Sequence, residues 1–130
     1  MKTGQIISVN THAEFLNRLL HLQYKQYMKC TYDLGDGDTV WMIRLDGKKS
    51  STGWINVATN GNNTIVEQYV GNAANKLPTH WIFPNERRVI FDIRETSYSR
   101  AYVFMGVFSL DAKSSNNCRI WNKVSDTYQF

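Results

Sequence analysis

The sequence predicts an α+β domain in which one N-terminal helix packs on a strongly curved, mainly antiparallel sheet or small β-barrel of about six strands. The first reason is composition, since 42% of the 130 residues are hydrophobic and 13% are aromatic, which suffices for one buried core. The second is periodicity: helical spacing of apolar residues is clear only near the N-terminus, and strand-like alternation with frequent turn signals follows from residue 39. No linker or repeat divides the chain, so residues 1–130 are predicted to form a single domain.

The helix is predicted over residues 12–29. Thr11 and Glu14 have the spacing of a capping box at its start. Apolar residues then recur at three- and four-residue intervals, which gives one apolar stripe: Phe15, Leu16, Leu19, Leu20, Tyr24, Tyr27 and Met28. Residues 33–38, rich in Asp and Gly, are predicted to be a loop after the helix.

Strands are predicted at residues 40–45, 53–59, 64–70, 89–94, 101–110 and 118–124. The fifth is apolar on both faces, which is typical of a central strand. It is predicted to carry Tyr102, Phe104, Phe108 and Leu110 on one face and Val103, Met105 and Val107 on the other. Gly106 in its middle predicts a bend or bulge. Residues 71–86 are predicted to be irregular, with Trp81, Ile82 and Phe83 closing an edge of the core.

The charge is mildly positive and evenly spread. Lys plus Arg number 15 and Asp plus Glu 11, for a net charge of +4 without a polybasic block. This distribution excludes a charged nucleic-acid-binding tail and leaves a basic patch assembled by folding. No apolar run is long enough to span a membrane, and no signal peptide is apparent. We therefore expect a cytoplasmic protein with no membrane partner, in which Cys30 and Cys118 are reduced thiols.

Neither a metal site, a cofactor site nor a catalytic residue is indicated. His12 and His21 would point to opposite sides of the predicted helix. Asp92 and Glu95 lack the following lysine of a metal-dependent nuclease, and no nucleophile elbow or phosphate-binding glycine loop is present. A non-enzymatic role is therefore favoured. The alternative is a small enzyme with a cysteine nucleophile, or with Asp92 and Glu95 as acid groups.

The last predicted strand carries the strongest binding signal. Alternation places Arg119, Trp121 and Lys123 on one face. An exposed indole would stack on a base while the flanking cations meet phosphates, which is how many proteins bind nucleic acid. Four further basic residues would extend the patch: Lys48, Lys49, Arg87 and Arg88. In the alternative interpretation, Trp121 fills the barrel and the charges face solvent.

Six aromatic residues suggest a second kind of site: Trp41, Trp54, Tyr69, Trp81, Tyr98 and Tyr102. A barrel lined by aromatic rings can hold one flipped base or another planar ligand. Trp54 and Tyr102 are candidate walls of such a pocket, and Asp92 and Asn56 are candidate hydrogen-bonding partners for a base edge. The alternative is that these rings belong to the core.

The C-terminal third resembles a known family. Tyr102-Val103-Phe104-Met105-Gly106-Val107-Phe108-Ser109-Leu110-Asp111, followed by Arg119-Ile120-Trp121-Asn122-Lys123-Val124-Ser125-Asp126, is similar to small PUA/SRA-like β-barrel modules. Such modules are appended to bacterial restriction nucleases and helicases. The resemblance implies a pseudo-barrel that binds nucleic acid, sometimes a modified base in an aromatic pocket. It also implies that Trp121 and Arg119 lie at or near the binding face, and that Gly106 kinks the central strand.

Two functions follow as expectations. The first is a non-catalytic, PUA/SRA-like module that binds nucleic acid in a bacterial or phage defence context. The second is a protein-interaction module, such as a phage or mobile-element inhibitor of a host enzyme, because Trp, Tyr and Arg dominate the energetics of protein interfaces.

Overall fold

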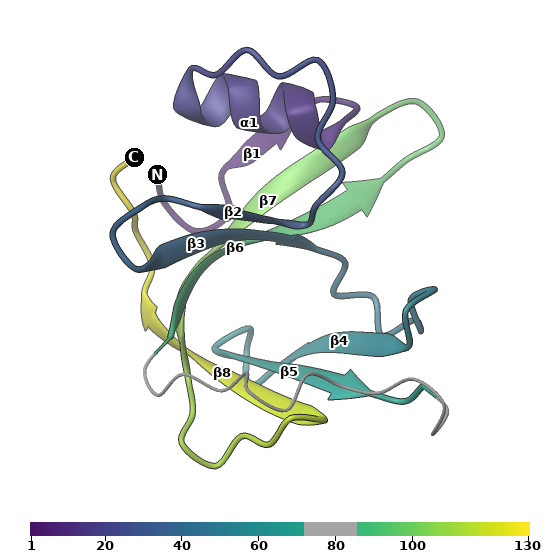
Figure 1. The fold of residues 1–130 in the computed structure, drawn as a ribbon, viewed down its shortest axis with the longest axis vertical. Helices are drawn as coiled ribbons and strands as arrows, with labels where there is room; N and C mark the ends of the chain where they lie inside the picture. The colour runs from purple at the N-terminus through teal and green to yellow at the C-terminus, as the bar shows by residue number, and fades with distance from the viewer. Residues whose placement is uncertain (72–85) are drawn as a thin grey trace.

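The computed structural model describes residues 1–71 and 86–130, in which one short helix accompanies a single sheet of eight strands (Figure 1). The elements are β1 (Ile6–Ser8), α1 (His12–Leu20), β2 (Thr31–Asp33), β3 (Asp38–Ile43), β4 (Trp54–Thr59), β5 (Thr64–Tyr69), β6 (Arg87–Glu95), β7 (Arg100–Leu110) and β8 (Cys118–Ser125). The sheet-dominated fold agrees with the prediction, although the strands number eight rather than about six. The predicted edge plug of Trp81, Ile82 and Phe83 lies outside the described residues.

The strand order shows an open, mixed sheet rather than a closed barrel. Neighbouring strands follow the order β2-β3-β6-β7-β8-β5-β4, and β1 pairs separately with β7. Every pairing among the described strands is antiparallel except that of β3 with β6, which is parallel. β7 is long enough to serve two partners along one side, with β1 beside its first half and β8 beside its second. The sheet curves through β6, β7 and β8, so that β4 and β5 lie opposite β3 (Figure 1).

A bulge in β7 confirms the predicted irregularity at Gly106 and corrects the predicted faces. Ile90 pairs with Gly106 and Phe91 with Phe104, so Met105 is an extra residue in β7. An extra residue reverses the alternation of all side chains that follow. Tyr102 and Phe104 therefore share a face with Val107, whereas Phe108 and Leu110 lie on the opposite face with Val103 and Met105.

The sheet has an apolar core on each face. On one face, α1 contributes Phe15 and Leu16, both fully buried. The Phe15 ring stacks on Tyr102 with centroids 4.2 Å apart and meets Phe91 edge-on at 4.7 Å. The other face carries a second apolar cluster, which includes Trp41 of β3 and Trp121 of β8. The candidate site lies on this second side.

The helix is shorter than predicted. Thr11 caps it as expected, with its hydroxyl accepting from the Glu14 amide, but α1 ends at Leu20 because His21 adopts a left-handed conformation with φ of 57°. The Asn17 side chain then bonds both backbone groups of Tyr24, which holds the chain outside the helix. Tyr24 and Tyr27 have helical spacing, yet they pack against one another and against Tyr32. Among the described residues, no helix has the length and apolar character needed to cross a membrane.

Two short strands were not predicted. β1 is three residues long and carries the half-exposed Ile6, so it has too little alternation to be recognised. β2 begins within the tyrosine-rich segment and ends at Asp33, where the sequence predicted a loop. Short edge strands of this kind depend on the neighbour with which they pair, here β7 and β3.

Candidate functional site

A large pocket lies between β3 and β6 on one side and β4 and β5 on the other. Most of it is on the face of the sheet opposite the α1 core, but one end reaches His12 of α1 and the α1-side residues Met42 and Ile93. Its volume is about 1020 Å³, at the upper end of the range for ligand pockets. Among residues 1–71 and 86–130, six basic side chains line it: Arg44, Lys48, Lys49, Arg88, Arg100 and Arg119. Asp46 and Glu67 are the only acidic lining residues in this described part of the chain. The pocket is therefore suited to an anionic or electron-rich partner.

The pocket has an aromatic wall. Trp54 of β4 and Tyr69 of β5 are cross-strand partners, with ring centroids 5.2 Å apart at an interplanar angle of 60°. Both rings are partly exposed and line the pocket, as does Trp41 of β3. Trp41 is almost fully buried, so the faces on which a planar ligand could stack are those of Trp54 and Tyr69.

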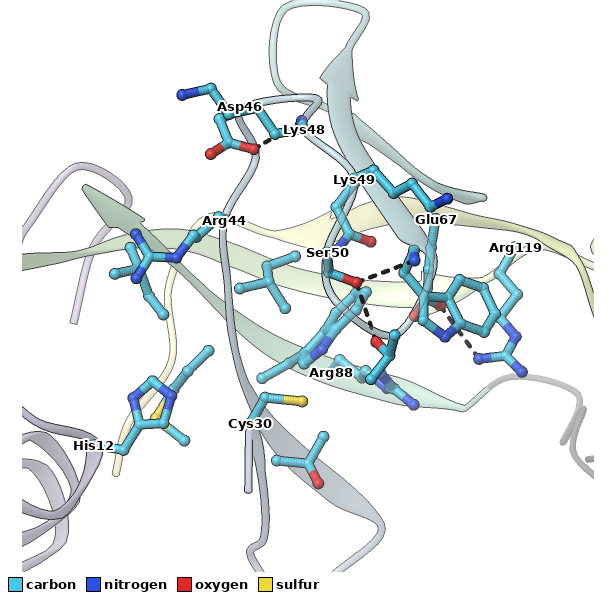
Figure 2. A pocket seen from close by; sticks show the side chains of 18 of the residues that line it. His12, Cys30, Arg44, Asp46, Lys48, Lys49, Ser50, Glu67, Arg88 and Arg119 are labelled. Carbon is cyan, nitrogen blue, oxygen red and sulfur yellow. Dashed lines mark hydrogen bonds and ion pairs between the residues drawn. The ribbon is translucent and has the colours of Figure 1, made fainter. Parts of the chain in front are cut away.

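Arginine guanidinium groups lie over tryptophan rings at the inner end of the pocket. The Arg88 guanidinium lies 4.6 Å from the ring centroids of both Trp41 and Trp121, and that of Arg119 lies 4.6 Å from Trp54. Glu67 Oε1 accepts a hydrogen bond from Trp121 Nε1 at 3.3 Å and lies 3.6 Å from Arg119 Nη1. These contacts fix the positions of two buried guanidinium groups and one buried carboxyl group (Figure 2).

Burial opposes the charge of this cluster. The pKa of Glu67 is raised because burial disfavours its carboxylate more than Arg88 and Arg119 favour it. The pKa of Arg119 is lowered, again chiefly by burial, although Glu67 acts in the other direction. Each charge is thus only partly compensated by the other, and a polar ligand entering the pocket would offer both groups additional hydrogen bonds.

Three polar residues form a row across the pocket floor. Asn56 of β4 pairs with Glu67 of β5, which in turn pairs with Arg119 of β8. Cross-strand partners point to the same face, so their side chains are close neighbours. The buried Asn56 Oδ1 accepts no hydrogen bond from the residues that the structure describes. The row therefore presents amide, carboxyl and guanidinium groups side by side.

A second polar cluster lies at the other end of the pocket. Arg44, Arg100 and His12 line this end, and the close-up shows Arg44 and His12 well apart from Glu67 and Arg119 (Figure 2). Both arginines form ion pairs with Glu95. His12 Nδ1 lies 2.6 Å from the Tyr102 hydroxyl, and burial, followed by Arg100 and Arg44, lowers the His12 pKa.

The structure brings together six of the residues that the sequence singled out. Lys48, Lys49, Arg88, Arg119, Trp54 and Asn56 all line the pocket. Arg119, Trp121 and Lys123 share one face as predicted, but that face is turned inward. Trp121 is fully buried and Arg119 is 4% exposed, so the predicted exposed indole flanked by cations is wrong. The reason is that β8 lies within the curved sheet, between β7 and β5.

The other candidates lie outside the pocket lining. Lys123 pairs with Asp126 and lies over the Phe108 ring, and Arg87 pairs with Asp38. Asp92 is buried, where it accepts from the Leu45 amide and pairs with Arg94. Tyr102 is buried in the α1-side core, with its hydroxyl beside His12. These four side chains therefore have structural partners instead of lining the pocket.

Glu67, Arg44, Arg100 and His12 line the pocket but were not among the predicted site residues, whereas Tyr69 was named only as one of six aromatic candidates. For Glu67 and Tyr69, a signal for their place beside the other site residues was present in the sequence. The turn at residues 60–63 fixes the β4–β5 register, and counting outward from it pairs Asn56 with Glu67 and Trp54 with Tyr69. Among residues 1–71 and 86–130, no group of three or more His, Cys, Asp or Glu is placed to hold a metal ion.

The fold is that of a small PUA-like module, with its pocket on the concave side of a curved sheet. Comparison with protein families gives a specific assignment: the model of the SET and RING associated (SRA) domain matches residues 1–130. The chain therefore belongs to the SRA domain family, which confirms the resemblance found in its C-terminal third.

Solved structures similar to this chain include one that matches nearly its whole length. It is the 5-hydroxymethylcytosine-specific restriction enzyme AbaSI, with a TM-score of 0.70 and 22% identity over 95% of this chain. The match covers 40% of AbaSI, so the chain spans less than half the length of that enzyme. At this identity the similarity shows a shared fold. No curated protein matches the chain.

Proposed function

We propose that this chain binds DNA and holds one base, turned out of the helix, in the pocket between β3 and β4. The observation that carries the proposal is the combination of an aromatic wall with a row of hydrogen-bonding groups, in a chain of the SRA family. A base stacks on aromatic rings and is identified by hydrogen bonds along its edge. Nucleic acid is also the class of partner that SRA domains bind.

Each part of the pocket has a role in this proposal. Trp54 and Tyr69 contact the face of the base. Asn56 and Glu67 accept hydrogen bonds from its edge, while Arg119 donates to a ring nitrogen or carbonyl oxygen. A cytosine edge offers an amino donor beside acceptors, which suits such a mixed row. The pocket volume leaves room for a substituent on the ring.

The proposed ligand is a cytosine modified at its 5-position. AbaSI is specific for 5-hydroxymethylcytosine, and the shared fold makes that base the first to test here. We further propose that the role is recognition rather than catalysis, in the cytoplasm and in defence against foreign DNA. The positive pocket lining supports such a role because the DNA backbone must approach the pocket for a base to enter it.

Fluorescence anisotropy tests the proposal with labelled duplexes that carry cytosine, 5-methylcytosine or 5-hydroxymethylcytosine at one central position. The wild-type chain should bind a modified duplex more tightly than the unmodified one. Trp54→Ala should lose about 1–3 kcal/mol of binding free energy, the usual effect of removing one stacking partner. The loss should be larger for the modified duplex, because only a base in the pocket contacts Trp54.

Met28→Ala is a suitable control for this experiment. Its side chain is 82% exposed and does not line the pocket, so the variant should bind as the wild type does. Equal affinity of the wild type for all three duplexes would contradict the proposed modified base. Unchanged binding by Trp54→Ala would contradict the proposed pocket.

A further inference from the structure

Three nitrogen donors meet one carboxylate oxygen at the end of the pocket away from Glu67. Glu95 Oε1 lies 2.7 Å from Arg44 Nη2, 2.7 Å from Arg100 Nη2 and 2.9 Å from Arg100 Nε. Arg44 directly follows β3, and Glu95 pairs with Arg100 across the β6–β7 hairpin. Because β3 pairs in parallel with β6, Arg44 lies near the end of β6, where Glu95 is. The fold thus aims two guanidinium groups at a single point.

The cluster has one more positive than negative charge. Both arginines line the pocket, whereas Glu95 does not. Their effect reaches the neighbouring residue His12, because Arg100 and Arg44 both contribute, after burial, to lowering its pKa. The positive potential at this end of the pocket is therefore not cancelled by Glu95.

The side chains are accessible but held in place. Arg44 and Glu95 are each 43% exposed and Arg100 is 27% exposed. Arg100 Nη1 also donates to the Tyr102 hydroxyl at 3.4 Å, and Tyr102 is fully buried. An anion from solution can reach these donors without the full desolvation that burial would require.

We propose that Arg44 and Arg100 form a binding site for one backbone phosphate of the DNA strand that enters the pocket, and that Glu95 occupies this site when DNA is absent. The inference rests on the proposed function. A phosphate oxygen accepts from guanidinium groups in the way that Glu95 Oε1 does here. DNA must therefore compete with Glu95 for the same donors.

Because of this competition, removal of Arg44 or Arg100 and removal of the Glu95 charge should have opposite effects on DNA binding. Removing an arginine removes a phosphate contact. Removing the charge of Glu95 releases both arginines and removes a repulsion between carboxylate and phosphate. If the cluster only stabilised the hairpin, loss of either side would act in the same direction.

The experiment measures the affinity of the chain for a duplex containing 5-hydroxymethylcytosine at several salt concentrations. Arg44→Gln and Arg100→Gln should each weaken binding about fivefold to tenfold at low salt, and each should reduce the salt slope by about 1. Glu95→Gln should instead strengthen binding several-fold. Arg44→Lys, which keeps the charge, should retain the wild-type salt slope.

Two variants serve as matched controls. Arg94→Gln removes an arginine that lies next to Glu95 in β6 and pairs with Asp92, outside the pocket lining. Asp126→Asn removes an exposed carboxylate that pairs with Lys123. Both should bind DNA within about twofold of the wild type, since neither contacts the proposed phosphate. Thermal unfolding of every variant verifies that it is folded.

The outcomes separate this inference from the proposed function. Weaker binding by Glu95→Gln, or Arg44→Gln and Arg100→Gln binding no more weakly than Arg94→Gln, would overturn the phosphate site while leaving base binding in place. A wild-type chain that binds none of the duplexes would overturn both.

Discussion

Single residues in this chain have roles that depend on which side of the sheet they face. Trp121 has cationic neighbours in sequence, a pattern that predicts an exposed nucleic-acid contact. In the structure it is fully buried, with its ring against Arg88 and its Nε1 donating to Glu67. Trp54 of β4 instead remains partly exposed in the pocket. The burial of Trp121 thus makes it a positioning residue for the charged groups of the pocket floor.

Trp121→Ala should therefore destabilise the fold rather than simply weaken binding. Truncating a buried tryptophan costs about 3–5 kcal/mol of unfolding free energy, and here it also removes a hydrogen-bond partner of the buried Glu67. Denaturant unfolding measures the change. Tyr98→Ala, at a side chain that is 96% exposed, should change the free energy by no more than about 0.5 kcal/mol. Similar changes in unfolding free energy for Trp121→Ala and Tyr98→Ala would show that Trp121 does not stabilise the core.

At the scale of elements, the bulge of β7 determines which side chains face α1 and which face the pocket. Gly106 has φ of +125°, and a Cβ at this position would lie 2.7 Å from the Ser125 carbonyl oxygen of β8. Only glycine tolerates both the conformation and the close approach. The bulge thus requires glycine, and the sequence predicted its position correctly.

Gly106→Ala should accordingly destabilise the chain by more than about 1 kcal/mol, because backbone strain and a clash with β8 add together. Gly37→Ala is a matched control: its φ is +92°, but no heavy atom lies within 4 Å of the added Cβ. The difference in unfolding free energy between the two variants isolates the clash. Equal destabilisation by Gly106→Ala and Gly37→Ala would mean that β8 shifts to make room for the added Cβ with no loss of free energy.

At the scale of the whole molecule, three carboxyl groups are stabilised in their ionised form by cationic or hydrogen-bonding partners. The pKa values of Glu95, Asp111 and Asp126 are all lowered, by Arg44 and Arg100, by the Lys113 amide and Asn122, and by Lys123, respectively. A carboxyl group with a lower pKa in the folded state binds fewer protons there than in the unfolded chain. Its contribution to stability is present above the unfolded pKa, near 4, and is lost as pH falls through the folded value.

The free energy of unfolding should therefore fall on acidification below about pH 5. Glu67 has the opposite effect on the pH dependence of stability because burial raises its pKa. The three carboxyl groups with lowered pKa values outnumber it. Urea unfolding across a pH series measures the profile. Asp111→Asn should flatten it, and Asn122→Ala, which removes one partner of Asp111, should do so by less. A stability that stays constant or rises between pH 5 and the acid limit would contradict this assignment of charges.

The sequence determined the local features of this protein. Alternation, turn residues and the capping box gave the order of most strands, the start of α1 and the bulge at Gly106, because each depends on neighbours along the chain. The residues of the C-terminal third also identified the family. Lys48, Lys49, Arg88, Arg119, Trp54 and Asn56 could be selected as binding candidates because Trp, Arg, Lys and Asn are common in such sites.

Only the tertiary structure decided which faces of the strands are buried and which residues meet. The sheet curves so that the β8 face carrying Arg119 and Trp121 closes against β3 and β6, and it brings Arg44, Glu95 and Arg100 together from three segments. Period-two alternation states that side chains share a face, but it carries no information about what covers that face. Burial is set by contacts between residues far apart in sequence, and these exist only once the sheet has formed.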